Sequence, residues 1–128
     1  PLPVLGLTVG DPAGIGPEIV HAALGDARVR TAARLVVLGP RSLRPADLPR
    51  AAGPDDAPEG ERSCWIETPG ESGDWTVGRA GAGGGRAALA ALRAGHELAA
   101  QGHVDALVTA PVSKEALALA GERVEGQS

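Results

Sequence analysis

Short apolar runs alternate along this chain with segments whose apolar residues have helical spacing. Four segments have the length and apolar content of buried strands, namely residues 5–9, 34–39, 63–67 and 104–109. The last of these runs is cut off by Pro111. Strands of this kind, with few alternating polar positions, are typical of a sheet that is covered on both faces.

Helical patterns lie between these strands. Gly16 and Pro17 open a helix after the first strand, because proline is favoured at the first helical position. Two further helices are predicted over residues 85–101 and 113–121, the second with Ser113 as its N-cap and Gly121 as its stop. A strand–helix–strand order favours a parallel sheet, so the pattern predicts an α/β layer fold.

One segment interrupts this order. Residues 45–62 contain four prolines, three aspartates and two glycines, and we interpret them as a loop or linker. The chain has 128 residues, the size of one ordinary domain. It has no Phe, Tyr or Met and only two Trp, so Ala, Leu, Val and Gly must form the core.

Charge and composition exclude some classes of protein. Twelve basic and 16 acidic residues give a net charge of −4, which argues against a general nucleic-acid binder. No apolar stretch approaches the length of a membrane span, and no signal-peptide pattern begins the chain. The one cysteine, Cys64, suits a reducing cytoplasm and is interpreted as buried and inert. The ends, Pro1 and Ser128, do not resemble natural termini, so we expect a fragment of a longer chain.

The segment GDPAGIGPE, residues 10–18, follows the first strand directly. Open α/β sheets bind ligands at such a place, beyond the carboxyl end of a strand and at a helix N-terminus. Gly10, Gly14 and Gly16 permit close backbone approach, and the flanking prolines make the loop rigid. Asp11 could bind a hydroxyl, amine or ribose, or could instead accept hydrogen bonds from the loop's own amides.

Two later motifs are also candidates for binding. VGRAGAGGGR, residues 77–86, lacks the Gly-Lys-Ser/Thr ending of a phosphate-binding P-loop and is interpreted as a flexible lead-in to the long helix. Its arginines, Arg79 and Arg86, leave room for an anion contact. VTAPVSKEAL places Thr109 and Lys114 on either side of a proline-fixed turn. Lys114 could meet a phosphate or carboxylate, or could be a solvated surface lysine.

The histidines do not form a metal site. His96 and His103 are seven residues apart, but Gly102 is expected to end the helix that would align them. No carboxylate or third histidine has ligand spacing, so a metal site within this chain is not expected. The chain also lacks the His–Ser or His–Cys arrangement of a nucleophilic hydrolase.

Taken together, the motifs resemble a known family. TVGDPAGIGPEI, VGRAGAGGGRAALAAL, VDALVTAPVSKEAL and AGERVEGQS occur in the order and spacing of the N-terminal part of the 4-hydroxythreonine-4-phosphate dehydrogenase (PdxA) family. The resemblance covers nearly the whole chain and is weakest across residues 45–74. It implies that residues 1–128 are the N-terminal portion of an isocitrate/isopropylmalate dehydrogenase-like, two-subdomain α/β/α fold.

The resemblance also implies a reaction. Family members oxidise 4-phosphohydroxy-L-threonine with NAD or NADP, and the product loses CO2 to give 3-amino-2-oxopropyl phosphate in vitamin B6 (pyridoxal phosphate) biosynthesis. A divalent metal such as zinc, magnesium or cobalt assists. The resemblance implies a cytoplasmic homodimer whose metal ligands and phosphate ligands lie outside these residues. Asp11, Gly14, Gly16, Thr109 and Lys114 are then expected to line the cleft.

The motif at the end of the chain departs from the family. Members usually have Gly-His-Thr where this chain has Gly-Gln127-Ser128, and the resemblance assigns that pair to substrate binding. Gln127 can form hydrogen bonds but cannot carry a charge as histidine can. Two alternatives therefore stay open: a relative acting on another hydroxy acid or diol, and a truncated remnant without activity. No catalytic residue is assigned.

Overall fold

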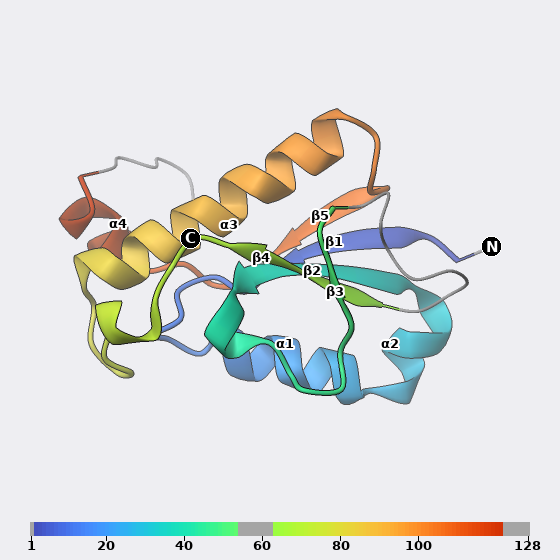
Figure 1. Ribbon diagram of the computed structural model, residues 1–128, viewed down its shortest axis with the longest axis horizontal. Coiled ribbons are helices and arrows are strands. Elements are labelled where there is room, and N and C mark those ends of the chain that lie inside the picture. Colours follow the sequence, from blue (N-terminus) through green and yellow to red (C-terminus); the bar gives the residue numbers. More distant parts are fainter. Residues whose placement is uncertain (1, 54–62, 122–128) are drawn as a thin grey trace.

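A five-stranded parallel sheet with helices on both faces forms the centre of the molecule (Figure 1). The computed structural model describes residues 2–53 and 63–121. The strands lie in the order β3-β4-β2-β1-β5. Their bounds are Val4–Thr8 for β1, Arg34–Pro40 for β2, Arg50–Ala51 for β3, Cys64–Thr68 for β4 and Ala106–Thr109 for β5.

The helices divide between the two faces of the sheet. Figure 1 shows α1 (Gly16–Gly25) and α2 (Ala27–Ala32) on one face and α3 (Ala82–Ala100) on the other. The short helix α4 (Lys114–Leu119) packs against α3. Two 3-10 turns, η1 (Arg41–Leu43) and η3 (Ser72–Asp74), complete the described elements.

The core is built from small side chains and one large one. Leu7, Val9, Val20 and Val37 cluster on the face that α1 covers, and Trp65 is buried among them. The Trp65 indole N–H donates to the Gly39 carbonyl oxygen at 3.2 Å, so this buried polar group is satisfied. A second cluster lies on the face that α3 covers; it contains Val36, Leu38, Ala51, Cys64, Leu98 and Val104.

The predicted α/β architecture is confirmed, and each predicted strand is present within two residues of its expected bounds. The predicted caps of the last helix are also confirmed. Ser113 Oγ accepts a hydrogen bond from the Ala116 amide at 3.1 Å, and Gly121 adopts a φ of 87°. As expected, the long helix ends before His103, with Gly102 at a φ of 78°.

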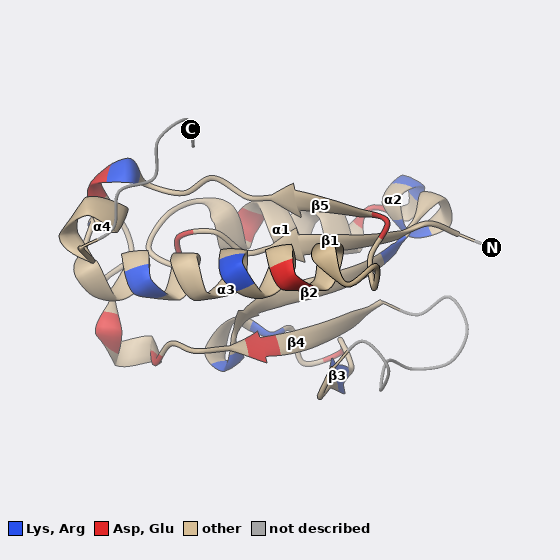
Figure 2. Cartoon of the chain, turned by 90° about the horizontal axis from the view of Figure 1, so that it is seen from above, with Lys and Arg blue, Asp and Glu red and all other residues tan. Residues whose placement is uncertain are grey.

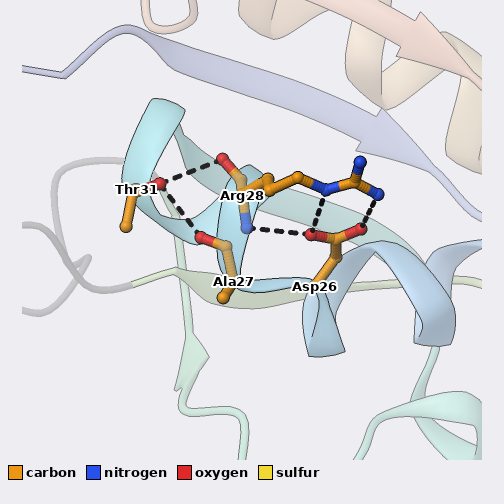
Figure 3. A network of polar contacts seen from close by, with 4 residues as sticks. All are labelled: Asp26, Ala27, Arg28 and Thr31. Atoms are coloured by element: carbon orange, nitrogen blue, oxygen red, sulfur yellow. Dashed lines mark hydrogen bonds and ion pairs between the residues drawn. The ribbon is translucent and has the colours of Figure 1, made fainter.

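The sequence did not predict α2, which a local polar network stabilises (Figure 3). The Asp26 carboxylate accepts hydrogen bonds from the Arg28 amide at 2.8 Å and from its guanidinium at 2.9 Å. Thr31 Oγ1 donates to the Ala27 and Arg28 carbonyl oxygens. None of the residues of α2 is fully buried, and only Val29 among them packs against the core, so the cap contributes much of what holds the helix. β3 was also missed, because it lies inside the expected 45–62 loop.

Candidate functional site

Strands β1 and β5 are neighbours, and the loops that follow them meet at the carboxyl end of the sheet. The chain leaves β1 toward α1 on one face, whereas α3 brings it to β5 over the other face (Figure 1). The connections of β1 and β5 thus lie on opposite faces of the sheet, which makes the carboxyl end of these two strands a topological switch point. The first and third sequence motifs are brought together there.

Direct backbone contacts join the two loops. The Asp11 amide donates to the Pro111 carbonyl oxygen at 3.3 Å. Gly10 has a φ of 77°, and a Cβ at this position would collide with the same Pro111 oxygen. Only glycine fits here without strain, because both its dihedral and its surroundings exclude a side chain. The switch point is thus a packed junction between two loops.

Asp11 belongs to this junction rather than to the surface. The residue is only 4% exposed, and its Oδ1 accepts a hydrogen bond from the Ala13 amide at 2.9 Å. Its carbonyl oxygen accepts a bond from the Gly14 amide at 3.0 Å. Of the two roles left open by the sequence, bonding to the loop's own amides is the one that these contacts show. A role in the cleft stays a prediction.

The predicted cleft glycines differ in what they require. A Cβ on Gly16 would collide with the Val9 carbonyl oxygen, so the start of α1 can approach β1 only with glycine at this position. Gly14 is exposed, and a Cβ there would lie 3.5 Å from its nearest neighbour, an ordinary contact. Close backbone approach within this chain is therefore confirmed for Gly10 and Gly16, whereas for Gly14 it stays a prediction.

Thr109 and Lys114 are both exposed at this edge of the molecule. Thr109 is the last residue of β5, and Lys114 is the first residue of α4. Between them lies the turn whose Pro111 oxygen binds Asp11. The structure thus places Thr109 and Lys114 close in the chain to the junction, with their surfaces accessible to solvent.

Sequence reasoning missed Thr8 in this region. Its side chain is 1% exposed, and its Oγ1 has no hydrogen-bond partner among the described residues. Thr8 pairs with Thr109 across the β1–β5 register, and its methyl group approaches Gly95 of α3. A polar residue at the end of an otherwise apolar strand was the available signal.

The structure corrects the interpretation of the glycine-rich motif, residues 77–86. It was interpreted as a flexible lead-in, but Ala82 to Gly85 form the first turn of α3, and its three glycines are buried. A Cβ on Gly83 would collide with the Asp74 backbone and one on Gly85 with the Ala116 backbone. A Cβ on Gly84 would lie 2.6 Å from Asp11 Oδ1. The motif therefore lets the start of α3 pack against three segments at once.

The predicted anion contacts of this motif stay predictions. Arg79 and Arg86 are exposed. Figure 2 shows basic and acidic residues both present along the outer side of α3, rather than a concentration of one sign. Among residues 2–53 and 63–121, no group of three or more His, Cys, Asp or Glu side chains could hold a metal ion.

Cys64 is fully buried, as expected. Burial raises the pKa of its thiol, and the neighbouring Arg34 only partly offsets this. Gln127 and Ser128, the predicted substrate ligands, lie outside the described residues. In the described part of the chain, no helix is long and apolar enough to cross a membrane.

A cavity lies away from the junction. It has a volume of about 660 Å³ and is lined by residues of α1, α2 and the loop before β3, including His21, Arg30 and Asp47. None of the predicted site residues lines it. The place where the loops after β1 and β5 meet, and not this cavity, is therefore the candidate site.

The fold and the site place this protein among the α/β proteins whose parallel sheet has a glycine-lined loop junction at its switch point. Comparison with known proteins specifies it further. The model of the family described as "Pyridoxal phosphate biosynthetic protein PdxA" matches residues 20–128. The chain belongs to this family.

Individual relatives agree with this assignment. A 4-hydroxythreonine-4-phosphate dehydrogenase from Synechococcus sp. (strain JA-2-3B'a(2-13)) is 37% identical, with 100% of this chain and 39% of that protein aligned. A Bradyrhizobium diazoefficiens protein, named provisionally as a D-threonate 4-phosphate dehydrogenase, is 39% identical over 97% of this chain and 39% of its own length.

A solved structure shares the fold. The crystal structure of a 4-hydroxythreonine-4-phosphate dehydrogenase from Burkholderia phymatum superposes with a TM-score of 0.87 at 31% identity. The match covers 98% of this chain and 41% of that chain. The predicted fold class, a part of the isocitrate/isopropylmalate dehydrogenase-like fold, is confirmed, and the chain spans less than half the length of these relatives.

Proposed function

We propose that residues 1–128 are the N-terminal portion of a dehydrogenase that oxidises 4-phosphohydroxy-L-threonine in pyridoxal phosphate biosynthesis. The observation that carries this proposal is the family match over residues 20–128. In the proposed reaction, the substrate alcohol becomes a ketone, a nicotinamide cofactor takes up the hydride, and the resulting β-keto acid loses CO2. The product is 3-amino-2-oxopropyl phosphate.

The residues of this chain form one wall of the proposed cleft. Thr109 and Lys114 are exposed beside the junction and are available to a phosphorylated substrate. A lysine ammonium interacts with a phosphate as a point charge, and a threonine hydroxyl can donate a hydrogen bond to it. Asp11 has a different role here. Because it is buried and bonded to Ala13, it positions the loop, and its place in the cleft stays a prediction.

The described residues do not fit a divalent metal. They contain no group of three or more possible ligand side chains, so no catalytic step of the metal is assigned to them. We propose that the metal and most of the contacts to NAD or NADP come from parts of the enzyme outside this chain. A homodimer in the cytoplasm, with the cleft completed by those parts, belongs to the same proposal.

Gln127 provides the test of substrate choice. The full-length gene product and its Gln127→His variant are assayed for NADH formation on 4-phosphohydroxy-L-threonine and on D-threonate 4-phosphate. A Gln101→His variant is a suitable control, because Gln101 is an exposed glutamine at the end of α3. Activity of the unmodified enzyme on the first substrate, raised by Gln127→His and unchanged by Gln101→His, is expected.

A second candidate substrate has an observation in its favour. The relative named for D-threonate 4-phosphate is as similar to this chain as the relatives named for 4-hydroxythreonine 4-phosphate. The two substrates are both phosphorylated hydroxy acids and differ in the amino group. Preference for D-threonate 4-phosphate, with no gain on the first substrate from Gln127→His, would establish this alternative. No turnover of either would favour a remnant without activity.

A further inference from the structure

The cavity beside α1 and α2 has the size and the lining of a ligand-binding site. Its lining includes Leu35, the second residue of β2, and Ser63, which directly precedes β4, so it lies at the amino end of these strands. The junction lies at the carboxyl end of the same parallel sheet. The cavity volume of about 660 Å³ falls within the range of about 300–1,000 Å³ that is typical of small-molecule sites.

Part of the lining is apolar. Leu35 is 4% exposed, and both Leu24 of α1 and Leu48 of the loop before β3 pack against the core cluster that contains Leu35. Pro45 and Pro49 line the cavity as well. These side chains favour a ligand with an apolar part, because contact with them removes apolar surface from water.

The loop on one side of the cavity is held by its own hydrogen bonds. The Leu48 amide donates to the Pro45 carbonyl oxygen at 3.1 Å, and the Arg44 guanidinium donates to the Leu48 carbonyl oxygen at 2.8 Å. The Trp65 amide donates to the Pro49 carbonyl oxygen at 2.8 Å. The loop therefore needs no ligand to keep this shape, which lowers the entropy cost of binding one.

Hydrogen-bond donors line the side formed by the helices. Arg30 of α2 donates through Nη1 to the Leu24 carbonyl oxygen at 3.3 Å, which holds its guanidinium beside the last turn of α1. A guanidinium has five N–H donors, so others remain for a ligand. His21 of α1 also lines the cavity, and the Ser63 hydroxyl, which accepts from the Leu35 amide at 2.9 Å, can itself donate. These donors suit a carboxylate.

Asp47 places a negative charge on the loop side of the same cavity. Within residues 2–53 and 63–121, neither Asp47 nor Arg30 forms an ion pair, and the Asp26 carboxylate before α2 is bound by Arg28 instead. Both charges of the cavity are therefore available to a ligand. Only a molecule with a carboxylate and an ammonium group can meet Arg30 and Asp47 together.

We propose that this cavity binds an α-amino acid with an apolar side chain. The ligand carboxylate accepts hydrogen bonds from Arg30, the ammonium group donates to Asp47, and the apolar side chain lies against the leucines of the lining. The proposal does not rest on the proposed dehydrogenase reaction, because neither Thr109 nor Lys114 lines the cavity.

Calorimetric titration of the full-length gene product with L-phenylalanine tests the proposal. L-Phenylalaninol lacks the carboxylate, 3-phenylpropanoate lacks the ammonium group and glycine lacks the apolar side chain. Each of these analogues is expected to bind at least about 10-fold more weakly, because each loses a charge-assisted hydrogen bond or the apolar contact. The heat of binding is measured without substrate or cofactor, so an enzyme inactive on both proposed substrates could still show it.

Substitutions in the cavity give an independent measurement. Arg30→Gln and Asp47→Asn each remove one charge from an exposed side chain, and each should weaken binding of L-phenylalanine about 10-fold. Arg41→Gln is the control, because Arg41 is exposed and does not line this cavity. Methyl NMR spectra locate the ligand, since its aromatic ring should shift the signals of Leu24 and Leu48.

Three results would overturn the proposal. They are no binding of L-phenylalanine at millimolar concentrations, equal affinity for L-phenylalanine and 3-phenylpropanoate, and unchanged affinity in both Arg30→Gln and Asp47→Asn. Equal affinity for 3-phenylpropanoate would instead assign the cavity to apolar carboxylates that need no ammonium group.

Discussion

The carboxylate of Asp11 lies against the first turn of α3, so close that a Cβ on Gly84 would be 2.6 Å from its Oδ1. These residues are 73 positions apart in the chain and belong to different sequence motifs. The contact places a buried carboxylate at the positive end of a 19-residue helix. It also joins the loop after β1 to the face of the molecule that carries α3.

Gly84→Ala tests this contact. The added methyl group must displace a buried carboxylate that is bonded to the Ala13 amide, so we expect a loss of about 1–3 kcal/mol in the free energy of unfolding. Gly81→Ala is the control, because a Cβ there meets nothing within 4 Å, and its effect should stay within about 0.5 kcal/mol. Urea unfolding measures both.

Asp11→Ala extends this test to a double-mutant cycle. Removing the carboxylate leaves the Ala13 amide without its acceptor, at an expected cost of about 1–3 kcal/mol. It also removes the atom with which the methyl group added by Gly84→Ala would collide. The double variant should therefore lose less stability than the sum of the two single variants. Strictly additive losses would show that the two residues do not interact.

Lys114 is expected to contact the substrate phosphate. In the full-length enzyme, Lys114→Ala should raise KM by about 10-fold or more, the loss of one charge-assisted hydrogen bond, with a smaller effect on kcat. Glu115→Ala is the control, since Glu115 is the exposed neighbour in the same turn of α4. Equal kinetics for the two variants would place Lys114 outside the binding site.

Cys64 should be inert in the folded protein. It has no exposed surface, and burial raises the pKa of its thiol, so little thiolate is present at neutral pH. Reaction with a disulfide reagent such as DTNB is expected to proceed at the rate of protein unfolding, and at once in concentrated guanidinium chloride. Rapid labelling under native conditions would contradict the burial of Cys64 in strand β4.

Asp26 should make the stability of α2 depend on pH. The hydrogen bond from the Arg28 side chain lowers the pKa of the Asp26 carboxyl below its ordinary value of 3.8. A group whose pKa is lowered by folding stabilises the protein above its unfolded pKa, and this contribution is lost as the pH falls through the folded value. Native-state hydrogen exchange of the α2 amides at pH 7 and at acidic pH measures the effect.

Asp26→Asn is the matched variant for this measurement. Asparagine retains an oxygen that can cap α2 but carries no charge. Wild type should therefore be the more stable at neutral pH, and the two proteins should converge as the pH falls. A difference that does not change with pH would show that the charge of Asp26 makes no contribution.

The elements with a strong apolar pattern could be predicted from the sequence. The strands around Leu7 and Val37 were found because their apolar runs reflect burial in the sheet. The run around Val108 also predicted a strand, although three of the four residues of β5 are exposed. α2 has no buried residue, so its apolar pattern gave no signal, although Asp26 as a helix cap was visible in the sequence. Tertiary packing decides the conformation of the glycine-rich motif, whose composition alone suggested flexibility.

The candidate site could be predicted only in part. The topology of a parallel sheet was enough to expect functional loops after the strands that end near Gly10 and Thr109. The inward turn of Asp11 and the approach of Gly84 depend on contacts between segments that are distant in the chain. No property of the local sequence could indicate them. The sequence did mark Thr8 as a polar residue at the end of an apolar strand, but only the packing shows that its hydroxyl is buried without a partner among the described residues.

The central claim is that this chain is part of a 4-phosphohydroxy-L-threonine dehydrogenase. The most direct measurement is NADH or NADPH formation by the purified full-length gene product, with a divalent metal, NAD or NADP, and that substrate. The account predicts turnover that requires the substrate and yields 3-amino-2-oxopropyl phosphate and CO2. Absence of turnover on this substrate, in an enzyme that oxidises a different phosphorylated hydroxy acid, would contradict it.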